Sequence, residues 1–167
     1  DITAAVLDRN TGQLVTNGNT KPIAIASVVK LFIADDLLLQ ESEGKTTLST
    51  DDRAALDRML RSSDDSAAQT FWDRSGGSAI IARIKARYGL AGTAAPWNGH
   101  WDVTTSTAND LVRYYDMLLD GTGGLPPDKA DIILGDLAHG GMAHQDLLDL
   151  DRVHVLTTGD DHVLLAV

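Results

Sequence analysis

The sequence contains no cysteine, which excludes disulfide bonds, iron–sulfur clusters and zinc sites built on thiolates. It also lacks an apolar run of the roughly 18–20 residues that a membrane-spanning helix needs. We expect no signal peptide within it, as for a processed secreted protein. Lysine and arginine are few beside aspartate and glutamate, 14 against 24, and they form no basic cluster. The net charge of -10 argues against nucleic acid or an anionic membrane surface as a partner.

What is present suffices for one folded core, because the chain has 167 residues and 43% of them are hydrophobic. Both ends have the pattern of strand pairs. Apolar residues 2–7 and 13–16 flank the turn formers of DRNTG, and RVHVLTTGDDHVLLAV closes the chain as two strands about a turn. We expect the two pairs to join in one antiparallel sheet packed with helices, an α+β fold with a second, all-helical lobe.

The middle of the chain has the pattern of helices, marked by capping residues, apolar spacing and glycine or proline stops. The expected helices cover residues 27–40, 51–61, 63–72 and 78–88, a segment opening at the threonines 104–105, and 128–137. This organisation predicts a single domain. Its α/β lobe would contain residues 1–45 with 130–167, and its helical lobe residues 46–129.

One residue contradicts the apolar character of the first helix. Lys30 lies in IASVVKLFIADDLLLQ, three residues after Ser27. Residues three apart share one helix face, so the Lys30 side chain can reach the Ser27 hydroxyl. Burial disfavours the charged form of a lysine, and a neutral amine can take the proton of a serine nucleophile. The alternative is a lysine whose stem packs on the core while its ammonium extends to water.

Four motifs in this order are typical of one superfamily. SVVK follows a strand hairpin, SDDSAAQ stands where S-D-N would be, TT follows a long loop, and TTG stands on a late strand in place of K-T-G. In these motifs, which extend over most of its length, the chain resembles the serine β-lactamases and penicillin-binding proteins, class A β-lactamases in particular. The remaining alternative is coincidence of the motifs in an unrelated α+β module.

The resemblance implies a role for each matched residue. Ser27 would be the acylated nucleophile, Lys30 its proton acceptor and Ser63 the group that passes a proton to the leaving group. The residues implied to line the substrate pocket are Asp65, Thr157, Thr158 and Gly159. A simple helix cap is the alternative for Ser63, and a hairpin turn for residues 157–159.

The resemblance also implies a biological setting. It predicts a secreted or cell-envelope protein of a bacterium, with no metal and no cofactor. The expected ligand is a β-lactam, a peptidoglycan peptide or an ester-type small molecule. The sequence does not indicate an oligomeric state.

Three departures from the family pattern oppose rapid hydrolysis. Asp65 replaces an asparagine, so a carboxylate that can only accept hydrogen bonds stands where an amide would donate one to the substrate. The carboxylate would also hold a neighbouring Lys30 in its charged form. Thr157 replaces the lysine of K-T-G, the cation that attracts a substrate carboxylate. The loop 89–103 contains no glutamate to act as the deacylating base. We expect an acyl-enzyme hydrolase with slow turnover; the alternative is a catalytically degenerate member that binds a cell-wall or protein partner.

Two further features have simpler interpretations. Trp97 and Trp101, both in the loop 89–103, could form a ligand platform, but a plug at the lobe interface is favoured. The acidic pairs at 35–36, 51–52 and 64–65 lack the glycine and ligand pattern of a calcium loop.

Overall fold

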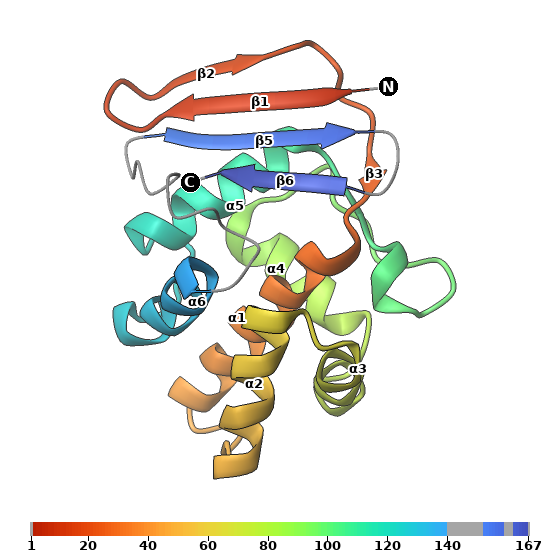
Figure 1. The fold of residues 1–167 in the computed structure, drawn as a ribbon, viewed down its shortest axis with the longest axis vertical. Coiled ribbons are helices and arrows are strands. Elements are labelled where there is room, and N and C mark those ends of the chain that lie inside the picture. The colour runs from red at the N-terminus through yellow and green to blue at the C-terminus, as the bar shows by residue number, and fades with distance from the viewer. Residues whose placement is uncertain (1, 140–151, 159–161, 167) are drawn as a thin grey trace.

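The computed structural model describes residues 2–139, 152–158 and 162–166. Strands lie towards both ends of the chain and helices lie between them (Figure 1). The strands are β1 (Thr3–Asp8), β2 (Gln13–Thr16), β3 (Ile23–Ala24), β4 (Thr105–Ser106), β5 (Arg152–Thr158) and β6 (His162–Ala166). The helices are η1 (Ala26–Val28), α1 (Val29–Ser42), α2 (Thr50–Ser62), α3 (Asp65–Arg74), α4 (Ala79–Tyr88), η2 (Trp101–Val103), α5 (Ala108–Asp120) and α6 (Pro127–His139).

The main sheet joins the two ends of the chain. Its strand order is β2-β1-β5-β6 and every neighbouring pair is antiparallel. The register places Thr3 opposite Thr157 and Asp8 opposite Arg152. The helices gather on the β6 side of the sheet in Figure 1, and α5 packs against β1 and β5. The predicted α+β fold with one antiparallel sheet built from both ends is confirmed.

Helix α1 is the centre of the helical part of the molecule. Its residues from Val29 to Leu38 are buried on all faces, as the apolar sequence predicts for a central helix. It contacts α2, α3, α4 and α6. Because α1 is enclosed in this way, its first turn is held firmly against the elements that surround the candidate site.

Most helix boundaries follow from their caps. Ser49 and Asp52 form a reciprocal capping box at the start of α2. The helix expected to open at residues 104–105 begins instead at Ala108, where the Thr107 hydroxyl accepts from the Asp110 N–H. Residues 105–106 form β4, which pairs with β3. Two-residue strands carry no periodicity, which is why the sequence did not indicate them.

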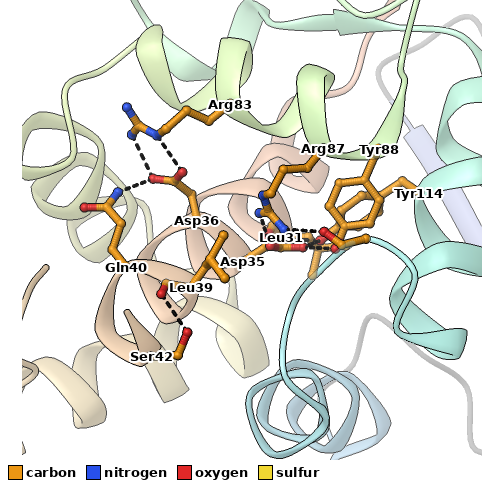
Figure 2. A network of polar contacts seen from close by, with 11 residues as sticks. Leu31, Asp35, Asp36, Leu39, Gln40, Ser42, Arg83, Arg87, Tyr88 and Tyr114 are labelled. Atoms are coloured by element: carbon orange, nitrogen blue, oxygen red, sulfur yellow. Dashed lines mark hydrogen bonds and ion pairs between the residues drawn. The ribbon is translucent and has the colours of Figure 1, made fainter. Parts of the chain in front are cut away.

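A polar network crosses the core between α1, α4 and α5 (Figure 2). Asp35 is fully buried and accepts hydrogen bonds from the Arg87 guanidinium and from the hydroxyls of Tyr88 and Tyr114. Burial raises the pKa of the Asp35 carboxyl, while the Arg87 charge acts in the opposite direction. Burial also raises the pKa of both tyrosines, so both stay protonated as donors.

The neighbouring carboxylate is also paired. Asp36 accepts two hydrogen bonds from Arg83, at 2.7 and 2.8 Å, and one from Gln40 at 2.6 Å (Figure 2). The acidic pair at 35–36 therefore anchors α4 to α1 through two arginines one turn apart.

Candidate active site

Three polar groups from three elements meet at the start of α1. Ser27 lies in η1, Lys30 in the first turn of α1, and Ser63 directly after α2. Lys30 Nζ donates to Ser27 Oγ at 3.3 Å and to Ser63 Oγ at 2.6 Å, and Ser63 Oγ donates to Ser27 Oγ at 3.0 Å. The two hydroxyls and the amine thus form a closed triangle.

The backbone on two sides of this triangle is strained. Ala26, directly before Ser27, has φ 43°, and Ser63 has φ 55°. Within the described residues these are the only two residues other than glycine with positive φ. Such conformations cost about 1–2 kcal/mol for a residue with a Cβ, and they persist where surrounding structure enforces them. Both strained residues here position a hydroxyl of the triangle.

Hydrogen bonds of neighbouring backbone hold the segment before Ser27. Strand β3 pairs with β4, and the Ile25 N–H donates to the Thr104 carbonyl at 2.9 Å. The Val28 N–H in turn donates to the Ile25 carbonyl at 2.9 Å. The strained Ala26 is therefore enclosed between two anchored neighbours.

Lys30 is almost completely buried, with 2% of its side chain exposed, so the alternative in which it extends to water is wrong. Besides the two hydroxyls, Nζ donates to the Ser63 carbonyl at 2.7 Å and to Asp65 Oδ1 at 2.6 Å. It also lies 5.0 Å from the ring centroid of Trp101. Four oxygens and an aromatic ring around one nitrogen form an environment that suits an ammonium ion.

The two aspartates of the SDD motif, residues 63–65, have different roles at the start of α3. Asp64 caps α3, where its carboxylate accepts from the Ala67 N–H at 3.0 Å, and this backbone hydrogen bond lowers the pKa of Asp64. Asp64 rather than Ser63 therefore caps α3, while Ser63 is the C-cap residue of α2, as the helix-cap alternative allows. Asp65 begins α3 with its side chain 77% exposed and one oxygen on Lys30.

An open pocket of about 380 Å³ lies in front of Ser27. The residues that line it are Ala26, Ser27, Asp65, Gln69, His100, Trp101 and Asp102. Sequence reasoning missed Gln69, His100 and Asp102. Gln69 follows Asp65 by four residues on α3, so the helical spacing could have indicated it. Nothing in the sequence brings the loop residues His100 and Asp102 to the pocket.

The two loop tryptophans behave differently. Trp101 is 8% exposed and forms a wall of the pocket against Lys30, so it is buried as a plug would be and borders the site as a ligand platform would. Trp97 is 88% exposed, and the expectation that it fills an interface is wrong. The indole N–H of Trp72 donates to the Gly99 carbonyl at 3.1 Å and fastens the loop to α3.

The remaining predicted pocket residues lie on the late strand. Thr157 and Thr158 are the last two residues of β5, where Thr157 pairs with Thr3 of β1 and with Val163 of β6. Gly159 lies outside the described residues. Across the described ranges, no group of three or more His, Asp or Glu side chains could hold a metal ion.

The fold is that of the class A β-lactamases. A β-lactamase from Chitinophaga pinensis superposes with a TM-score of 0.75 at 15% identity, covering 99% of this chain and 83% of that one. An ancestral class A β-lactamase gives 0.71 at 17% identity, over 99% of this chain and 83% of that one. A β-lactamase from Xanthomonas campestris gives 0.73 at 14% identity, over 99% and 81%. No family model matches the sequence.

The sequence itself is similar to mycobacterial proteins. "Putative lipoprotein LppW" of Mycobacterium tuberculosis is 63% identical over 137 residues, which cover 82% of this chain and 44% of that protein. The protein of the same name from Mycobacterium bovis matches to the same extent. The chain therefore spans less than half the length of these relatives.

Proposed function

We propose that the chain is a β-lactamase-like or penicillin-binding-protein-like serine hydrolase of the bacterial cell envelope, which works through an acyl-enzyme on Ser27. The observation that carries this proposal is the closed triangle of Ser27 Oγ, Lys30 Nζ and Ser63 Oγ, with sides of 3.3, 2.6 and 3.0 Å. Each group lies within about the distance that proton transfer requires. The class A β-lactamase fold around the triangle supports the same reaction class.

In the proposed reaction Ser27 Oγ attacks a carbonyl carbon of the substrate and forms a C–O bond. The neutral Lys30 amine takes the hydroxyl proton of Ser27. Ser63 then passes a proton from Lys30 to the leaving group, as the bond between the leaving group and the carbonyl carbon breaks. Ser27 lies at the start of a helix, where the positive end of the helix dipole favours the oxyanion of the tetrahedral intermediate.

Two features favour slow turnover. Lys30 must be neutral to accept a proton, and the carboxylate of Asp65 stabilises the charged form across 2.6 Å. This ion pair would oppose proton transfer to Lys30, so acylation would be slow. The loop 89–103 has no glutamate to activate water, so the acyl-enzyme would persist.

The contact between Lys30 and Asp65 also favours a second candidate function. An ammonium held by four oxygens is stable as it stands, and such a site could bind a cell-wall or protein partner without turning over. In this alternative the strained Ala26 and Ser63 would be remnants of an active ancestor.

The cell-envelope location draws on the relatives. The mycobacterial proteins carry the word lipoprotein in their name, and a lipid anchor would hold such a protein at a membrane surface. Among the described residues, no helix is both long enough and apolar enough to cross a membrane. A β-lactam or a peptidoglycan peptide would be met in this location.

Intact-mass measurement after incubation with a penicillin and, separately, with a fluorophosphonate tests the proposal. We expect one covalent adduct on the wild type and on Ser62→Ala, the matched control at the exposed neighbour of Ser63, and none on Ser27→Ala. An adduct with the fluorophosphonate alone would identify an ester-type pocket. Absence of any adduct on a folded wild type would refute the hydrolase and leave the binding function.

A further inference from the structure

We propose that the pocket in front of Ser27 selects an acyl donor whose non-reacting end is positively charged, in preference to one that ends in a carboxylate. The inference names the substrate class of the same site and rests on the proposed serine hydrolase. It starts from the charges that a ligand would meet in the pocket, which are opposite in sign to those a carboxylate-bearing β-lactam requires.

Two carboxylates line the pocket. Asp102 is exposed, and it has no ion pair or hydrogen bond within the part of the chain that the structure describes. The Asp65 side chain is 77% exposed, and its Oδ1 accepts a hydrogen bond from Lys30. Its Oδ2 accepts no hydrogen bond from the described residues. The other polar side chains of the lining are the neutral Ser27 and Gln69 together with His100.

Lys30 offsets part of the charge of Asp65, with which it forms an ion pair at 2.6 Å, so Asp102 is the pocket carboxylate without a cation among the described residues. Only 2% of its side chain is exposed, and Nζ already donates to Ser27, Ser63 and Asp65. Its ammonium lies behind the nucleophile and against the Trp101 ring. A substrate carboxylate could approach Lys30 only by displacing Asp65.

The rest of the chain adds to this field. The net charge is -10, and the neutral Thr157 stands where the motif resemblance places the lysine of K-T-G. A concave site with carboxylates at its opening raises the local concentration of cations and lowers that of anions. Added salt screens both effects, because the Debye length falls from about 30 Å at 0.01 M to about 3 Å at 1 M.

Three thioesters of phenylacetic acid test the proposal. Their thiols are thiocholine, 2-mercaptoethanol and 2-mercaptoethanesulfonate, which are cationic, neutral and anionic. In each case the Ser27 Oγ–C bond forms, the C–S bond breaks and the serine proton goes to the thiolate. All three leave the same phenylacetyl-enzyme, so differences between them report acylation alone. The chain has no cysteine, and a thiol reagent therefore reads the released thiol without background.

We expect the thiocholine ester to acylate Ser27 about tenfold faster than the sulfonate ester at low salt, after correction for the alkaline hydrolysis of each thioester. Salt at about 0.5 M should remove most of this ratio. Asp102→Asn should lower the ratio of the cationic to the anionic ester about threefold. Asp51→Asn removes the same charge at the other end of α2, about 18 Å along the helix axis from Ser63. This variant should leave the ratio unchanged.

The outcomes separate this proposal from the one on which it rests. Equal rates, or a faster sulfonate ester, with Ser27 acylated would overturn the charge preference and leave the hydrolase standing. If no thioester acylates Ser27, the proposed hydrolase activity is refuted. The charge preference is then tested by binding of two small ligands to the Ser27→Ala variant, measured by tryptophan fluorescence. Tighter binding of benzyltrimethylammonium than of phenylacetate would support it, and equal or weaker binding would refute it.

Discussion

The ammonium of Lys30 and a carboxylate oxygen of Asp65 lie 2.6 Å apart, yet one side chain is 2% exposed and the other 77%. The pair thus crosses the boundary between the core and the pocket. Water around Asp65 weakens the attraction, but the carboxylate still favours the charged form of the amine behind it. Among the contacts of Lys30, this one opposes the role of a base most directly.

Asp65→Asn should therefore raise the rate of acylation several-fold, because it removes the charge that holds the Lys30 ammonium. The amide keeps the size of the side chain and can still accept a hydrogen bond from Lys30, while the negative charge is gone. Mass-resolved acylation by a fluorophosphonate over time measures the rate. Asp51→Asn is the matched charge control and should react like the wild type. A slower Asp65→Asn would show that the carboxylate assists the reaction.

Ala26→Gly should stabilise the protein and impair the site. Glycine adopts φ 43° without strain, so we expect a gain of up to about 1 kcal/mol in the free energy of unfolding. The same freedom loosens the position of Ser27, and acylation should slow several-fold. Denaturant unfolding and acylation kinetics measure the two effects. Ala24→Gly, in β3 with an ordinary φ, should instead lose stability; a loss in both variants would contradict the strain argument.

Much of the site could be predicted because its signals are local. Lys30 and Ser27 are three residues apart, and helical geometry alone brings them into reach. Ser63 was assigned from the order of motifs rather than from geometry. Its hydroxyl reaches Ser27 only because the backbone turns at φ 55° after α2, which no pattern of apolar residues indicates.

Helices and strands were predicted where the apolar periodicity or the capping residues were strong. Features that depend on contacts between segments distant in the sequence were missed. Asp35 and Asp36 looked like an ordinary acidic pair because their partners Arg83 and Arg87 come about 50 residues later in the chain. Charged residues within the apolar segment 25–40 were nevertheless a signal of pairing, by the same reasoning that singled out Lys30.

Arg87→Met should cost about 3–5 kcal/mol of unfolding free energy, because it leaves the buried Asp35 without its cation. Arg83→Met is the matched control one turn earlier on α4. Its side chain is 42% exposed against 19% for Arg87, so water can replace part of its interaction with Asp36 and the loss should be smaller. Urea unfolding of both variants checks the ranking. Equal losses would mean that exposure does not decide the cost.

The capping box of α2 predicts a dependence on pH. The hydrogen bond from the Ser49 N–H and the Arg74 guanidinium lower the pKa of Asp52. A carboxyl whose folded pKa is below its unfolded value stabilises the fold above about pH 4, and this stabilisation is lost as pH falls through the folded pKa. Asp52→Asn should therefore be about 1 kcal/mol less stable than the wild type at pH 7.

That difference should shrink as pH falls through the folded pKa of Asp52, because the wild-type carboxyl then becomes protonated as well. Urea unfolding at a series of pH values measures it. Asp51→Asn, which makes neither the Ser49 nor the Arg74 contact, is the control and should show a smaller difference that does not follow this course. A constant deficit for Asp52→Asn at all pH values would contradict the ionic origin of the effect.

The pairing of Thr3 with Thr157 sets an order of events during folding. Strand β1 stays without its partner β5 until the chain has been extended from Thr3 as far as Thr157. Contacts between residues so distant in sequence slow folding, because a long loop must close before they form. The helices can assemble earlier from local contacts, so the part of the pocket that η1 and α3 line can exist before the sheet closes.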